Sequence, residues 1–205
     1  KDGIGLIAPS GETSVTGRYE GNSSSVTVYG TTPAYETVNG LSLLLGRFIK
    51  SSDVDSHTNV AVINETAATE LIGYTDCIGE EVSLDGVKFT VVGLLEDDEN
   101  SLTAVFGSGS MVAYIPYTSL MRLSSEVSSD ITSFSVSAET DMAAAETAMT
   151  SLLMERFDQD DDAFTVSSQD VLEDAMSSVT SVLMILLGSI AGISLIVGGI
   201  GIMNI

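Results

Sequence analysis

The sequence predicts an α+β domain followed by a transmembrane helix, and three observations support this fold class. Residues 60–95 follow a strand–helix–strand–strand pattern, and residues 111–166 alternate strands and helices, as in helices packed on one face of a mixed sheet. Residues 182–205 contain no Asp, Glu, Lys, Arg or His. The rest of the chain carries all 29 acidic and 7 basic residues, which give a net charge of -22.

The first part of the chain predicts short strands and one turn. Strand-type runs cover Gly3–Ala8, Ser14–Glu20 and Ser25–Gly30, and the last run alternates with the period of two that a half-buried strand needs. Pro33 then opens a turn or short helix, and the apolar run Leu41–Leu45 follows it.

Residues 60–73 predict a buried strand and a capped helix. Val60–Ile63 is a continuous apolar run, which is typical of a strand that is covered on both faces. Asn64 can cap the next helix, because its side chain accepts a hydrogen bond from a free backbone amide. Gly73 supplies the left-handed residue that ends such a helix.

A hairpin follows, and after it the chain becomes strongly acidic. The Asp85-Gly86 pair favours the tight turns that join antiparallel strands, here Glu81–Leu84 and Val87–Leu95. The acidic runs at 96–99 and 158–162 predict solvated loops. Calcium binding by these runs is the alternative, but neither has the spacing of a calcium-binding loop.

The second half predicts strands and helices in alternation, ending in a long helix. The apolar residues of 141–157 recur at steps of three and four, which predicts a helix that packs on the sheet. The expected elements are the strands Met111–Ile115, Ile131–Ala138 and Phe164–Val166, the helices Tyr117–Leu123 and Asp141–Phe157, and a helix from Gln169–Ser178 that continues into the tail.

The uncharged tail, Val182–Ile205, predicts a membrane span. As a helix its 24 residues would be roughly 36 Å long, which exceeds the ~30 Å apolar core of a bilayer. A soluble helix usually has a polar face, and this segment has none. The alternative is a fully buried helix in the core of a large soluble domain.

Small residues in the tail predict close helix packing within the membrane. Gly188 and Gly192 form a GxxxG pair, and Ser194 and Gly198 repeat the same spacing. Residues of this size four apart let two helix backbones approach each other in lipid. The predicted packing residues are Gly188, Gly192, Gly198, Gly199 and Gly201. The alternative is that glycine is simply frequent in membrane helices.

Charge excludes some partners and indicates the side of the membrane. The basic residues are scattered singly, so the basic patch that binds nucleic acid or anionic lipid headgroups is missing. Arg156 is the only basic residue within about 25 residues before the tail. Because cytoplasmic flanks are rich in Lys and Arg, this flank is expected on the outer side.

Nothing in the sequence predicts catalysis, a cofactor or a metal site. Cys77 is the only cysteine, so we expect a packed side chain and no intramolecular disulfide. His57 is the only histidine and lies in a polar stretch without a nucleophile motif. The sequence contains no phosphate-binding P-loop, HExxH or CxxC motif.

Several short motifs, in one order, resemble MacB/FtsX-type ABC transporter permeases. The tail run ISLIVGGIGIMNI, residues 193–205, is similar to the start of the second transmembrane helix of that family. The segments that resemble family motifs in the outer domain are Gly46-Arg47-Phe48 with Asp53, Val60–Ile63 with Ala67, Ala68 and Leu71, Ile78-Gly79, and Phe89–Gly93. Gly30, Pro33 and Tyr35 reproduce a further family pattern, for which we expect a structural role rather than ligand contact.

The resemblance implies a two-part extracytoplasmic domain. A membrane-proximal, porter-like α/β subdomain would comprise residues 1–45 and 109–178, and a smaller sabre-like β-α-β-β subdomain, residues 46–108, would be inserted in it. Residues 179–205 would form the transmembrane helix. A first transmembrane helix would precede Lys1, and residues 1–178 would lie outside the cytoplasm.

The resemblance also implies a function in transport. The expected partners are an ABC ATPase subunit that hydrolyses ATP, a second permease in a homodimer or heterodimer, membrane lipid, and a MacA-like membrane fusion protein. The substrates would be macrolides, peptides or lipoproteins. One alternative is a surface binding protein or adhesin with a single C-terminal span. A second is an extracellular hydrolase that uses carboxylates.

Overall fold

The computed structural model describes residues 4–97, 110–123, 132–138, 142–156, 164–166, 179–192 and 194. It divides into two compact units. Ile4–Glu139 forms one unit, which holds all the strands, and the residues from Thr140 onward belong to the other together with Lys1–Gly3.

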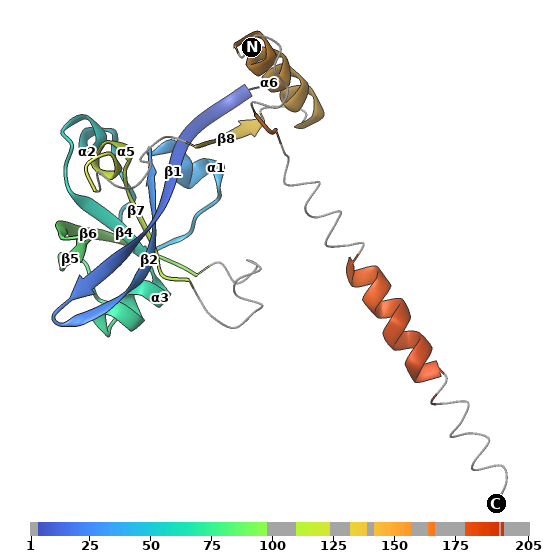
Figure 1. The fold of residues 1–205 in the computed structure, drawn as a ribbon, viewed down its shortest axis with the longest axis horizontal. Coiled ribbons are helices and arrows are strands. Elements are labelled where there is room, and N and C mark those ends of the chain that lie inside the picture. Colours follow the sequence, from blue (N-terminus) through green and yellow to red (C-terminus); the bar gives the residue numbers. More distant parts are fainter. Residues whose placement is uncertain are drawn as a thin grey trace, which may run out of the picture. The chain divides into compact units, whose positions relative to one another are not determined.

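In the described residues, the first unit contains eight strands and short helices (Figure 1). The strands are β1 (Ile4–Tyr19), β2 (Asn22–Thr31), β3 (Leu43–Gly46), β4 (Val60–Asn64), β5 (Glu81–Leu84), β6 (Val87–Leu95), β7 (Val112–Pro116) and β8 (Ser133–Ala138). The helices are α1 (Ala34–Val38), α2 (Ser51–Asp55), α3 (Glu65–Ala67), the π-helical turn η1 (Ala68–Ile72) and α5 (Tyr117–Leu120). The mixed α/β character therefore confirms the α+β prediction for this part of the chain.

Six of the strands pair in a closed ring. The neighbours run in the order β2-β7-β4-β6-β5-β1, and β1 pairs again with β2. The β2–β7 and β4–β6 pairs are parallel and the other pairs of the ring are antiparallel. A closed ring leaves no free strand edges, so these six strands form a small barrel. β3 pairs with the second half of β6, on the outside of this ring.

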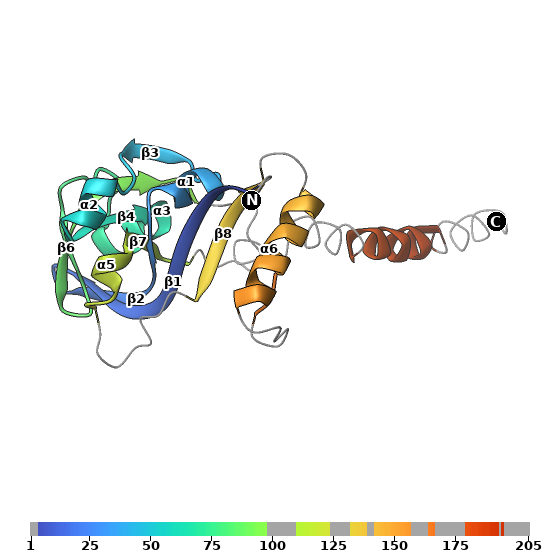
Figure 2. The same ribbon diagram turned by 90° about the horizontal axis from the view of Figure 1, so that it is seen from above.

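β1 is longer than the sequence predicts. Its 16 residues cover two predicted strand runs and the residues between them. The first half, up to Ser10, pairs with β8, and the second half, from Gly11, pairs with β2. Figures 1 and 2 show β1 extending from the barrel to lie beside β8. One strand thus connects the barrel to a two-stranded ribbon.

Two apolar clusters cover opposite faces of β4. Ala61 and Ile63 belong to the barrel core, which also includes Phe89. Val62 faces the other way, into a smaller cluster that contains Phe48 and Leu95. All five residues of β4 are buried, which confirms the prediction of a strand covered on both faces.

Three local features that the sequence predicts, a helix cap, a helix end and a hairpin turn, are present in the structure. Asn64 caps α3, because its Oδ1 accepts a hydrogen bond from the N–H of Ala67 at 3.1 Å. Gly73 ends η1 with a φ of 99°. Asp85 and Gly86 join β5 to β6 with φ values of 47° and 85°, so both turn residues are left-handed, as a tight hairpin requires.

Some predicted boundaries differ from the structure. The prediction of a strand at Phe164–Val166 is wrong, because this short segment pairs with no other strand among the described residues. α5 ends at Leu120, and residues 121–123 continue as a turn. Residues 98–109, 157–163 and 167–178 lie outside the described residues, and with them most of both acidic loops and the helix start at 169–178.

Strands from both predicted subdomains share one sheet. β1, β2 and β7, which belong to the predicted porter-like part, form one side of the ring, and β4, β6 and β5 of residues 46–108 form the other side. The predicted subdomain limits stay a prediction, and the pairing shows that they do not separate two sheets.

The second unit contains two described helices. α6 (Met142–Arg156) matches the helix predicted for 141–157. A further helix covers residues 179–192, and every described side chain in it is exposed. In the described part of the chain, no helix combines the length and apolar character needed to cross a membrane.

Candidate functional site

Arg47, from the Gly46-Arg47-Phe48 motif, and Asp53 form a partly buried ionic clamp. Arg47 Nη1 donates to Asp53 Oδ2 at 2.6 Å and Arg47 Nη2 donates to Asp53 Oδ1 at 3.2 Å. Asp53 also accepts hydrogen bonds from the backbone N–H of Lys50 and the hydroxyl of Thr58. A two-pronged guanidinium–carboxylate contact fixes geometry as well as charge. The clamp therefore holds the start of α2 against the segment that follows β3.

Burial and hydrogen bonding act in opposite directions on the Asp53 carboxyl. Burial alone would raise its pKa, because it disfavours the charged form. The hydrogen bonds from Arg47 and from the Lys50 amide, and the charge of Arg47, outweigh that effect. The pKa of Asp53 therefore lies below its ordinary value, and the carboxylate is charged at neutral pH.

Gly46 and Gly93, which belong to two different motifs, lie where two backbone segments pack directly against each other. A Cβ on Gly46 would lie 2.3 Å from the carbonyl oxygen of Val92, and one on Gly93 would lie 2.3 Å from that of Arg47. Both distances are shorter than any real contact allows, so neither position has room for a side chain. These glycines let β3 and the segment after it close onto β6, where Arg47 N–H donates to Val92 O at 2.9 Å.

Aromatic side chains gather on the outer face of the barrel around Tyr114. Tyr29 is its register partner in β2 and stacks on it with ring centroids 5.4 Å apart. Tyr35 of α1 and Phe48 lie 5.7 and 5.9 Å from Tyr114, in tilted geometry. The group joins the motif residues Tyr35 and Phe48, and it supports the structural role expected for Tyr35.

The environment of these tyrosines disfavours their ionised form. Burial, and then the nearby charge of Glu12, raises the pKa of Tyr29 to about 12. The same two causes raise the pKa of Tyr35. At the other end of the barrel, the pKa of Tyr19 is also raised, because its hydroxyl is hydrogen-bonded with Tyr74 and donates to Glu80. All three hydroxyls therefore stay protonated at neutral pH.

Asn64 joins three segments that are distant in the sequence. Its Oδ1 accepts from the N–H of Val112 at 2.9 Å as well as from Ala67, and its Nδ2 donates to Asp97 Oδ1 at 2.6 Å and to Ser110 O at 2.9 Å. All the hydrogen-bonding capacity of the amide is thus used.

Asp97 departs from the prediction of a solvated acidic loop. Its Oδ2 accepts from both the N–H and the hydroxyl of Thr66, at 3.1 and 2.7 Å. A carboxylate is favoured beside free amides at the start of a helix, which explains its place at α3. Thr66 and Asp97 are 31 residues apart, and the sequence offered no signal that relates them.

The surroundings of Cys77 and His57, the two residues considered for catalysis, are those of structural residues. Cys77 is fully buried, as expected, and burial raises the pKa of its thiol, so the reactive thiolate is disfavoured. His57 is exposed at the end of α2, in a left-handed conformation with a φ of 52°. Among the described residues, no group of three His, Cys, Asp or Glu residues is placed to hold a metal ion.

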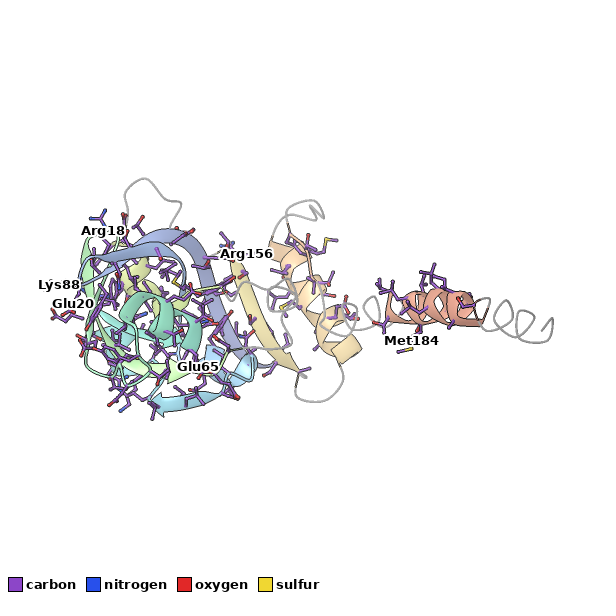
Figure 3. The ribbon with its side chains drawn as sticks, turned by 90° about the horizontal axis from the view of Figure 1, so that it is seen from below. Arg18, Glu20, Glu65, Lys88, Arg156 and Met184 are labelled. Carbon is purple, nitrogen blue, oxygen red and sulfur yellow. The ribbon has the colours of Figure 1, made fainter. Side chains whose placement is uncertain are left out.

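The tail glycines fall partly within the described helix. Gly188 and Gly192 lie in the helix at 179–192, and a Cβ on either would meet no atom within 4 Å. The neighbouring apolar side chains are exposed around the helix, and Figure 3 shows Met184 pointing away from it. Gly198, Gly199 and Gly201 lie outside the described residues.

The barrel surface carries the basic residues Lys88 and Arg18. Lys88 of β6 donates to Glu81 of β5 at 3.0 Å, and both side chains are exposed. Arg18 lies across β5 from Lys88, and Figure 3 shows both on the barrel.

Comparison with known proteins gives a family for this fold. The model of the MacB-like periplasmic core domain matches residues 3–152. The macrolide export ATP-binding/permease protein MacB of Neisseria meningitidis is 30% identical over 189 residues, which cover 91% of this chain and 28% of that protein. The ABC transporter permease YknZ of Bacillus subtilis is 30% identical over 206 residues, which cover 100% of this chain and 50% of that protein.

A solved structure has the same fold. The crystal structure of the periplasmic region of MacB from Actinobacillus actinomycetemcomitans superposes with a TM-score of 0.70 at 23% identity, covering 86% of this chain and 78% of that chain. The chain thus spans between about a quarter and a half of these two curated relatives and most of the solved outer domain. With the match over residues 3–152, it follows that this chain belongs to the family of MacB-like periplasmic core domains of ABC transporter permeases.

Proposed function

We propose that this chain is the extracytoplasmic part of an ABC transporter permease that couples ATP hydrolysis by a partner ATPase to movement outside the membrane. The family match over residues 3–152 carries this proposal. The clamp at Asp53, the paired glycines and the Asn64 junction support it, because a barrel joined at these points can move as one body. In this proposal the chain contributes no catalysis, and the ATPase hydrolyses the nucleotide.

The tail would anchor and connect the domain. We propose that residues 179–205 form a transmembrane helix, with Gly188, Gly192, Gly198, Gly199 and Gly201 as its packing residues and residues 1–178 on the outer side. The apolar side chains exposed around the helix at 179–192 support this, since a helix without a polar face suits lipid. The two-part division, with porter-like and sabre-like subdomains, belongs to the same proposal.

The partners and substrates follow the family. We expect a permease homodimer or heterodimer, a MacA-like membrane fusion protein outside, and contact with membrane lipid. The relatives named MacB are described as macrolide exporters, so macrolides are one candidate substrate class, and peptides and lipoproteins are others. The family match does not favour the alternative of an adhesin with one span.

Energy transfer in a membrane tests the proposal. The full-length permease is assembled with its ATPase in lipid nanodiscs, with a donor dye on a cysteine at the exposed position Glu70 and acceptor dyes on the lipid headgroups. Cys77→Ala removes the one competing thiol of this chain. We expect ATP to change the transfer efficiency and an ATPase-inactive variant to abolish the change. The same efficiency with and without ATP would contradict the proposed function.

A further inference from the structure

β1 alone, among the described strands, pairs in two separate sheets. Ile4–Ser10 pairs with β8 in a two-stranded ribbon, and the residues from Gly11 to Tyr19 pair with β2 in the barrel. At the rise of an extended chain, its 16 residues span roughly 50 Å. Any displacement of the ribbon along the strand therefore reaches the barrel through continuous backbone.

β1 exchanges its partners at Pro9. The carbonyl of Pro9 accepts a hydrogen bond from the hydroxyl of Thr31, the last residue of β2, at 2.8 Å. The next carbonyl, of Ser10, accepts one from the N–H of Thr132, just before β8, at 3.2 Å. Because successive carbonyls of a strand point to opposite edges, β2 and β8 lie on opposite edges of β1.

Proline explains why the exchange occurs at this residue. Pro9 has no N–H, so it cannot extend the β1–β2 ladder beyond the pair of Gly11 and Gly30. The edge of β1 that faces β8 is unaffected, because the residues before and after Pro9, and not Pro9 itself, make the hydrogen bonds on that edge. Pro9 thus ends the β1–β2 ladder and permits the β1–β8 ladder at the same point.

The buried face of β1 changes at the same place. Ala8 and Ser10 are buried in the ribbon half, whereas in the barrel half every second residue from Gly11 onward is buried. Two consecutive buried residues, Ser10 and Gly11, mark the point where the strand passes from one packing layer to the next. Here Ser10 Oγ lies 2.7 Å from Ser133 Oγ, and Thr31 is fully buried.

We propose that Pro9, Ser10 and Gly11, which we call the β1 crossover, form the joint that transmits movement from the β8 side of the domain to the barrel. Hydrogen bonds from Thr31, Thr132 and Ser133 hold the joint on both edges, so the barrel follows the ribbon. This inference rests on the proposed function, and it assigns the step of transmission to named residues.

The test uses the same full-length permease and ATPase. It measures the same energy transfer, from the dye at position 70 to the dyes on the lipid headgroups. Thr31→Val removes the hydroxyl that binds Pro9 O at nearly constant volume, and Ser10→Ala removes the contact with Ser133. Each loss should raise the population of opened joints by about fivefold, the factor expected for one buried hydrogen bond. We expect the double variant to hydrolyse ATP while its ATP-driven change in energy transfer falls by about twofold or more.

Ser14→Ala is the matched control. Ser14 Oγ lies 3.0 Å from Ser25 Oγ on the same strand, so this variant loses a similar contact away from the crossover and should behave as wild type. Circular dichroism verifies that each variant is folded, and the single Thr31→Val variant replaces the double variant if the latter unfolds. A wild-type response in the crossover variants would overturn the inference alone, whereas a wild-type permease without any response would overturn the proposed function.

Discussion

At the scale of single residues, the family motifs act by geometry rather than by chemistry. Arg47 and Asp53 are one charged pair whose atoms also bind backbone, and Gly46 and Gly93 are places where two backbones touch. Each motif is local in the sequence, and each makes its contact with a segment that lies elsewhere. The motif residues Gly46, Arg47, Asp53 and Gly93 thus fix how β3, α2 and β6 meet.

Asp53→Asn should remove a pH-dependent part of the stability. The pKa of Asp53 is lowered in the folded chain, so its ionised form stabilises the fold above the ordinary carboxyl pKa of about 4. That contribution is lost as the pH falls through the lowered pKa. We expect urea unfolding to show wild type more stable than Asp53→Asn at pH 7, with the difference shrinking below about pH 4.

Glu81→Gln is the control for this prediction. Glu81 also pairs with a cation, but both partners are exposed, and such pairs contribute less than about 1 kcal/mol. Its stability should therefore stay close to that of wild type across the same pH range. A difference for Asp53→Asn that does not change with pH would contradict the assignment.

Gly93→Ala should destabilise the fold far more than Gly79→Ala. The new methyl group at 93 meets the carbonyl of Arg47 at 2.3 Å, and forced overpacking against backbone costs about 3 kcal/mol or more. Gly79 has open space and a φ of 95°, so alanine there adds only backbone strain of roughly 1–2 kcal/mol. Urea unfolding ranks the two, and equal losses would show that the close approach at Gly93 relaxes.

At the scale of elements, the barrel is assembled by contacts between segments far apart in the sequence. Asn64 ends β4 and caps α3, and it also binds the residues that precede and begin β7. Asp97, which follows β6, completes this junction. Three strand ends therefore meet at one side chain.

Asn64→Ala should loosen this junction. The substitution leaves the N–H groups of Ala67 and Val112 without their partner, and unsatisfied buried groups cost about 1–3 kcal/mol each. It also removes one of the hydrogen bonds to the Asp97 carboxylate, which keeps those from Thr66. We expect a loss of roughly 3 kcal/mol in urea unfolding and faster amide exchange at Val112. Asn59→Ala, at an exposed position in the loop before β4, should change neither.

The sequence predicted local structure well because local signals decide it. The Asn64 cap, the Gly73 helix end and the Asp85-Gly86 turn depend on neighbours within a few residues. The closed ring was not predicted, since the pairing of β1 with β2 and β5 depends on chain segments that periodicity cannot relate. The contact of Asp97 with Thr66, 31 residues away, was hidden for the same reason.

At the scale of the whole molecule, the chain combines a rigid acidic domain with an apolar tail. Gly188 and Gly192 have space on the helix surface for a partner helix. Gly188→Leu with Gly192→Leu should therefore weaken association of full-length permeases in detergent by about tenfold, measured by energy transfer between labelled copies. Ser189→Leu, which adds similar bulk outside the pair, is the control, and equal effects would contradict a specific packing face.

The excess of acidic residues should make folding stability depend on salt. A net charge of -22 repels itself in the compact state, and the described ion pairs, Arg47–Asp53 and Lys88–Glu81, neutralise little of it. Raising NaCl from ~20 mM to ~500 mM shortens the screening length from about 20 Å to about 4 Å. We expect the Tm to rise by about 3–6 °C, as for a gain of roughly 1–2 kcal/mol. At pH 4, where part of the carboxylates are protonated, the rise should be smaller. A Tm at pH 7 that does not change with salt would contradict this prediction. It would mean that the acidic residues lie farther apart than the screening length and therefore do not repel one another.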